Sequence, residues 1–201
     1  MAAFFSNLRN TIVAGVVLIV VLIILVGIGV KFPTFGHDWA LFLVRALHIL
    51  SGIMWIGLLY YFNFVQTPSM PKIPDEQKPA VSKVIAPKAL FWFRWGAMST
   101  IVFGLLLALM NGYLIDAILI GITDSGNSTM IGIGMWLGTI MWFNVWFIIW
   151  PNQKIALGIV DAPADAKPKA ARMAGMYSRV NTMLSLPMLY CMVAQSHGGL
   201  T

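Results

Sequence analysis

Long apolar runs alternate with short polar segments along this chain of 201 residues. A helix rises about 1.5 Å per residue, so about 20 apolar residues cross a hydrocarbon core about 30 Å thick. The pattern predicts five transmembrane helices, at residues 11–30, 39–66, 90–110, 130–150 and 179–196. The fourth is expected to end at Pro151, because proline has no backbone N–H and clashes with the preceding turn. The predicted fold class is therefore all-α, a polytopic integral membrane helix bundle.

Lysine and arginine are unevenly distributed between the predicted loops. They gather before the first span, between the second and third spans, and between the fourth and fifth, whereas the other loops hold only Lys31. Cytoplasmic loops are enriched in these residues, so the alternation predicts a cytoplasmic N-terminus and an outer C-terminus. The proline-rich segments 68–79 and 161–171 are predicted to be solvated connectors. The cytoplasmic set is Arg9, Lys72, Lys78, Lys83, Lys88, Lys154, Lys167, Lys169 and Arg172, with Arg179 at the membrane edge.

The composition agrees with a protein that is dissolved in a lipid bilayer. Hydrophobic residues make up 59% and charged residues 10%, against about 25% charged in soluble domains, and the mean hydropathy is +0.83. The net charge of +6 lies in the loops, so we assign it to topology and expect no nucleic-acid partner. The single cysteine, Cys191, excludes an internal disulfide, a thiolate-held iron–sulfur cluster and a Cys-x-x-Cys-His haem attachment site.

Polar residues inside the second span are the first functional candidates, since such residues are costly in lipid. His48, Gly52 and Trp55 follow i, i+4, i+7 spacing, and Arg45 lies one turn outward on nearly the same face. This stripe is predicted to face protein. His48 is eighteen residues above Gln66, which is about 27 Å along a helix.

His197 is likewise eighteen residues from the start of the fifth span at residue 179. The two histidines are therefore expected at similar levels near the outer boundary, where His48 and His197 could ligate a b-type haem and Arg45 could neutralise a propionate. No other cofactor is expected. The alternative is that His48 makes an interhelical hydrogen bond, Arg45 snorkels to the headgroups, and His197 is an interfacial tail residue.

Other polar residues in the spans are predicted to be structural. Arg94, flanked by Trp92 and Trp95, is typical of an interface anchor. Asn144 and Asn181 are expected to hydrogen-bond between helices. None of the seven carboxylates lies deep in a span, which disfavours a transporter with a buried acid as proton relay. The chain has no phosphate loop, nucleophile elbow or His-Glu-x-x-His, so whether it is itself an enzyme stays open.

Four segments together carry a resemblance to a known family: "LHILSGIMWIGLLYYF", "LFWFRWGAMSTIVFGLLL", "IGIGMWLGTIMWFNVW" and "SRVNTMLSLPMLYCMVAQSH". They resemble, in order, the membrane domain of the bacterial PuuD-type urate oxidase (urate hydroxylase) family, over about residues 39–197. The resemblance implies an N-terminal anchor helix and outer loop at residues 1–38 and a four-helix PuuD-like membrane domain at residues 39–201. It also implies a bacterial inner membrane location, with His48 and His197 on positions similar to histidines of the family.

In that family the membrane domain precedes a c-type cytochrome domain on the outer side, and the pair is proposed to oxidise urate. This chain ends at Thr201 without a Cys-x-x-Cys-His, and it has Gly96 in "WFRWG" where the family's "WFKWE" has an acid. The leading hypothesis is an accessory or electron-transferring membrane subunit of a redox assembly, with other membrane subunits and a separate cytochrome c or oxidase as partners. One alternative is a urate-type oxidase working with a separate cytochrome c, and another is a purely structural subunit.

Overall fold

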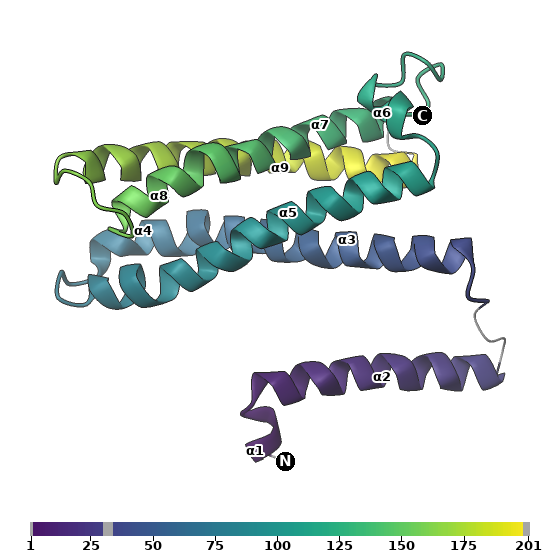
Figure 1. Ribbon diagram of the computed structural model, residues 1–201, viewed down its shortest axis with the longest axis horizontal. Helices are drawn as coiled ribbons and strands as arrows, with labels where there is room; N and C mark the ends of the chain where they lie inside the picture. The colour runs from purple at the N-terminus through teal and green to yellow at the C-terminus, as the bar shows by residue number, and fades with distance from the viewer. Residues whose placement is uncertain (1, 30–33, 199–201) are drawn as a thin grey trace. The chain divides into compact units, whose positions relative to one another are not determined.

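The computed structural model describes residues 2–29 and 34–198 of the chain. All regular elements in these residues are helical (Figure 1). The chain divides into two compact units, residues 1–42 and 43–201, which are described separately. The prediction of an all-α membrane helix bundle is confirmed at the level of fold class.

The first unit is dominated by the long helix α2 (Leu8–Gly29), preceded by the short helix α1 (Ala2–Phe5). The Asn7 side chain accepts a hydrogen bond from the Arg9 N–H at 2.9 Å, which caps the first turn of α2. Apolar side chains around the whole circumference of α2 are exposed, Leu18 at 62% and Leu25 at 62% among them. A helix that is apolar all round suits a membrane span, as the sequence predicted.

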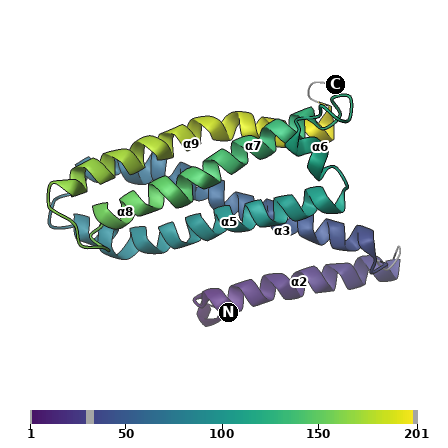
Figure 2. The same cartoon turned by 45° about the horizontal axis from the view of Figure 1, so that its top comes forward.

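The second unit is a bundle of long helical rods that lie alongside one another (Figures 1 and 2). α9 packs along α7 and α8, and α5 packs against α7. The short helix α6 lies against the start of α7. The elements are α3 (His37–Tyr60), η1 (Tyr61–Gln66), α4 (Thr67–Ser69), η2 (Met70–Lys72), η3 (Ala80–Ile85), α5 (Ala86–Met110), α6 (Leu114–Ile118), α7 (Thr129–Phe143), η4 (Asn144–Ile149), α8 (Trp150–Ala156) and α9 (Ala166–His197).

Three of the rods contain a π-helical segment that is followed by a proline: η1 by Pro68, η3 by Pro87 and η4 by Pro151. In each case the residue before the proline donates its N–H to a carbonyl five residues back, for example Trp150 to Val145. The wider turn gives the proline ring room without breaking the helix. The predicted end of the fourth span at Pro151 is therefore wrong, and the rod continues to Ala156.

The second and third helices also extend further than predicted on the side where the sequence predicts the cytoplasm. The second span continues to Lys72 and the third begins at Ala80, so residues 68–72 are helical rather than part of a loop. Within the described residues, four rods are long and apolar enough to cross a membrane: Leu8–Ile28, His37–Lys72, Ala80–Met110 and Thr129–Ala156.

The predicted fifth span, α9, has 32 residues but is less apolar than the other four rods. Its most polar spanning residues are buried, since Asn181 and Ser185 are fully shielded while Met183 and Leu186 are 63% and 65% exposed. α9 thus presents its apolar face outward and its polar face to the bundle.

Glycines allow two close helix contacts in the second unit. A Cβ added at Gly134 of α7 would lie 3.1 Å from the Cys191 Cβ of α9, so the two helices pack closely at this glycine. A Cβ added at Gly96 of α5 would lie 3.2 Å from the Trp55 backbone nitrogen of α3. A glutamate at residue 96, as in the family's pattern, would therefore require the neighbouring part of α3 to shift by a few tenths of an ångström.

Candidate functional site

His48 of α3 packs against α5 with one ring nitrogen fixed. Its Nδ1 lies 2.9 Å from the Thr100 backbone oxygen. Because a carbonyl oxygen can only accept, Nδ1 carries the proton, and Nε2 keeps its lone pair. Nε2 has no hydrogen-bond partner among the described residues. Metal-ligating histidines have this arrangement, in which one nitrogen donates to a carbonyl and the other is free to coordinate.

Gly104 makes room for the His48 ring. A Cβ added at Gly104 would lie 2.9 Å from the His48 Cε1 and 3.1 Å from its Nδ1, which is shorter than van der Waals contact. Gly52, one turn below His48 on α3, has open space where a side chain would stand. Trp55, the next residue of the predicted stripe, is buried in the core. His48 and Trp55 thus face protein, as predicted, whereas the space beside Gly52 is open.

Arg45 differs from the rest of the stripe because it is exposed at the outer end of α3. It lies close enough to Tyr113, in the turn after α5, to act on it electrostatically. Burial raises the pKa of the Tyr113 hydroxyl, and the positive charge of Arg45 opposes that rise. Arg45 and Tyr113 therefore place a cation and a phenol beside the outer end of the His48 helix.

His197 is the last residue of α9 and is exposed. Its Nδ1 lies 3.1 Å from the Val193 oxygen of its own helix, and Gly198 ends the helix with a positive φ of 67°. α9 ends on the side of the bundle where α3 begins (Figure 1). Each histidine thus has its Nδ1 occupied by a carbonyl, but no described contact joins the two rings, so their pairing as haem ligands stays a prediction.

The residue types and tautomers are compatible with a haem. His48 offers a fixed imidazole with a free Nε2, and Arg45 offers a cation one turn outward. No group of three or more His, Cys, Asp or Glu side chains within the described ranges could hold a metal ion.

A second polar site, which the sequence did not indicate, lies inside the bundle near the end of α3 and the start of α5. It is a cavity of about 140 Å³ with lining residues from η1, η3, α5, η4, α8 and α9. The Gln66 Oε1 is shielded from solvent and lacks a hydrogen-bond partner. The Asn63 Nδ2 donates to the Leu59 oxygen at 2.9 Å and to the Ser178 Oγ at 2.8 Å. Its polar lining is Asn63, Gln66, Thr67, Ser82, Gln153, Ser178 and Arg179.

Between the two sites, polar side chains tie the helices together. The Asn144 Nδ2 donates to the Asn181 Oδ1 at 2.8 Å, and the Asn181 Nδ2 donates to the Met141 oxygen at 2.9 Å. The predicted interhelical hydrogen bond is therefore confirmed. The Tyr60 hydroxyl also lies 2.9 Å from the Ser185 Oγ, which connects α3 to α9.

Arg94 of α5 stacks on an aromatic ring of the neighbouring rod. Its Cζ lies 3.2 Å from the centre of the Trp150 ring, a cation–π contact. Its Nε and Nη1 are shielded and have no hydrogen-bond partner among the described residues. Its sequence neighbours Trp92 and Trp95 are 56% and 47% exposed. The aromatic belt agrees with the expected anchor, while the guanidinium itself is held by α8.

The fold and these sites define a class: an integral membrane helix bundle with polar side chains buried between its helices. Residues 117–201, from the end of α6 through α9, match the family model described as urate oxidase N-terminal. The match supports a urate oxidase N-terminal-type membrane domain, in agreement with the resemblance seen in the sequence. It includes His197, Asn144 and Asn181 but not His48. No curated protein and no solved structure matches the chain.

Proposed function

We propose that this protein is an integral membrane subunit of a redox assembly in a bacterial inner membrane, related to the urate oxidase membrane domain. The observation that carries the redox role is the geometry of His48. Its Nδ1 is fixed on the Thr100 carbonyl, and its Nε2 is free in the outer half of the bundle. The family match supports the relation to urate oxidase.

A b-type haem at this place would supply one-electron transfer. His48 would hold the iron through Nε2, Gly104 would keep the imidazole in position, and Arg45 would pair with a propionate. His197 is the proposed second ligand. Other membrane subunits and a separate cytochrome c or oxidase are the proposed partners.

An absorption spectrum of the purified full chain tests this proposal. Wild-type protein is expected to show a Soret band and a reduced α-band. His48→Ala and His197→Ala should each remove or shift these bands, because each removes an axial ligand. His37→Ala is the matched control, since His37 is exposed at the first turn of α3. A colourless wild-type protein, isolated with its native partners and without chelators, would overturn the haem assignment.

The inner cavity favours a second candidate function, a urate-type oxidase that reduces a separate cytochrome c. Amide side chains on several helices surround a space large enough for a small polar molecule. Gln66→Leu and Gln153→Leu should then abolish urate-dependent reduction of added cytochrome c, while an exposed control, Gln77→Leu, should not. The structural alternative would be favoured if the purified protein showed no such turnover and a companion oxidase nevertheless failed to assemble without this chain.

A further inference from the structure

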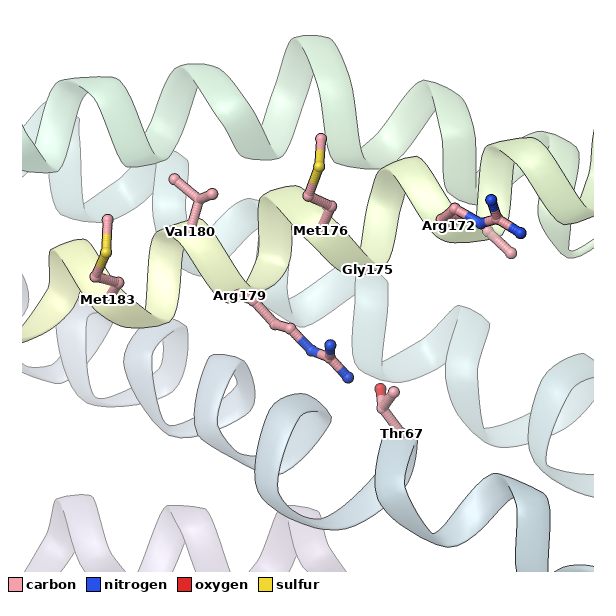
Figure 3. Close-up of a pocket in the computed structure, with 8 residues that line it drawn as sticks. Thr67, Arg172, Gly175, Met176, Arg179, Val180 and Met183 are labelled. Carbon is pink, nitrogen blue, oxygen red and sulfur yellow. The ribbon is translucent and has the colours of Figure 1, made fainter.

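A groove of about 640 Å³ runs along the outward face of α9 at its N-terminal half, between α9 and α4 (Figure 3). Arg172, Gly175, Met176, Arg179 and Met183 line it from α9, and Thr67 lines it from α4. The Arg179 side chain reaches across from α9 toward Thr67 (Figure 3). The groove opens on the outward side of α9 and is distinct from the inner cavity, although Thr67, Gly175 and Arg179 border both.

The two arginines in the groove have no counter-charge. Arg172 and Arg179 are seven residues apart, so they lie on nearly the same face of α9, about 10 Å apart along the axis. Neither makes an ion pair or a hydrogen bond in the ranges that the structure describes, where Lys78–Asp75 is the one salt bridge. Both side chains are exposed. The groove therefore attracts an anion.

The groove changes character along α9. Beyond Arg179 its lining is apolar, with Val180 half-buried and Met183 63% exposed, while Met176, which is 50% exposed, lies between the two arginines. A Cβ at Gly175 would meet nothing within 4 Å, so the floor of the groove is open. The occupant must therefore have an anionic end beside the arginines and an apolar end that follows the helix toward the membrane interior. A phospholipid with net negative charge has this shape and polarity.

We propose that this groove binds an anionic phospholipid. Its phosphate lies between Arg179 and Arg172, with the Thr67 hydroxyl as an additional donor, and an acyl chain follows Val180 and Met183. Basic pockets on the cytoplasmic side of membrane helices bind anionic headgroups in this way. The start of α9 is on the predicted cytoplasmic side, where such headgroups are found. The inference does not depend on the proposed redox role.

Native mass spectrometry of the full chain in mild detergent tests the proposal, with phosphatidylglycerol and phosphatidylcholine as probes. Both lipids carry a phosphate, but only phosphatidylglycerol has a net charge. Wild-type protein should retain phosphatidylglycerol selectively. The Arg172→Gln/Arg179→Gln variant should bind it about 30-fold more weakly, or about 2 kcal/mol at roughly 1 kcal/mol for each basic side chain. The matched control is Lys83→Gln/Lys88→Gln, which removes the same charge outside the groove.

A second variant separates lipid binding from folding. Gly175→Leu keeps both arginines and fills the open floor, so it should displace the lipid while leaving the helix content unchanged. Equal retention of phosphatidylglycerol by wild type, the double variant and Gly175→Leu would overturn the proposal, as would equal retention of the two lipids by wild type. A photoreactive residue at Met176 that cross-links only to a protein subunit would also overturn it, because the groove would then hold a partner helix.

Discussion

Gly104→Ala is a direct test of how His48 is held. The new Cβ would lie 2.9 Å from the His48 Cε1, whereas carbon atoms in contact are about 3.5–4.0 Å apart, so the ring must retreat by about 0.6–1.1 Å. Its hydrogen bond to Thr100 is 2.9 Å long and would stretch to the limit of hydrogen bonding if the ring moved along it. The structure therefore predicts that one methyl group disrupts this contact.

The expected energy is the sum of two opposing effects. Replacing a helical glycine by alanine stabilises a helix by about 1 kcal/mol. Loss of an interhelical hydrogen bond in a membrane protein costs about 0.6 kcal/mol on average, and displacing the ring adds a packing cost of similar size. Gly104→Ala should thus be close to neutral. Gly52→Ala, on the neighbouring helix α3, should stabilise the protein by the full gain in helix propensity, because its Cβ would meet nothing within 4 Å.

A double-mutant cycle in detergent micelles measures the difference. In a His48→Ala background the ring is absent, so Gly104→Ala should stabilise as much as Gly52→Ala does. The cycle should give a coupling energy of about 1 kcal/mol between residues 48 and 104. If Gly104→Ala stabilises the wild-type protein as much as Gly52→Ala does, the His48 ring is not confined by α5, and the argument for its fixed tautomer fails.

Three further predictions concern other parts of the second unit. Gly96→Glu should destabilise the bundle by several kcal/mol in denaturant unfolding, because the new Cβ meets rigid backbone of α3. Asn181→Ala should cost about 1–2 kcal/mol in the same assay, since it removes two buried hydrogen bonds. The hydrogen bond and charge of Lys78 hold the pKa of Asp75 below its usual value. The pair therefore stabilises the folded state at pH values above the ordinary aspartate pKa. This contribution is lost as the pH falls through the lower pKa that Asp75 has in the folded state. Stability curves at acidic pH should therefore be flatter for Asp75→Asn than for wild type, and equal curves would contradict the pairing.

The sequence was sufficient to predict the helices and the direction of several polar side chains. Apolar runs of about 20 residues have few structural solutions other than membrane-spanning helices. The asparagines of α7–η4 and α9 could be paired from sequence because an amide in a span must find a partner, and Asn144 and Asn181 do so. The prediction that His48 and Trp55 face protein is also confirmed, since i, i+7 spacing places two residues on one face of a helix.

Several ends of the helices could not be predicted from the sequence. The expected end at Pro151 is one example, because proline usually ends a helix. Pro68, Pro87 and Pro151 each follow a π-helical turn, and the helix continues through all three. Whether a chain breaks or widens its turn at proline depends on the packing of the rods around it, which is not local information. The inner cavity was missed for a related reason. Its amides come from residues such as Gln66 and Gln153 that are far apart in sequence and meet only when several rods are assembled.

The residues that carry the family match differ from the residues that carry the haem proposal. Residues 117–201, which match the urate oxidase N-terminal family model, contain the Asn144–Asn181 pair and the polar face of α9. These features explain why α9 is less apolar than its neighbours and yet exposes apolar side chains. His48 and Gly104 lie outside that segment, on α3 and α5. The haem proposal therefore rests on the His48–Thr100 contact and the space at Gly104, and the experiments on these residues test it independently of the family relation.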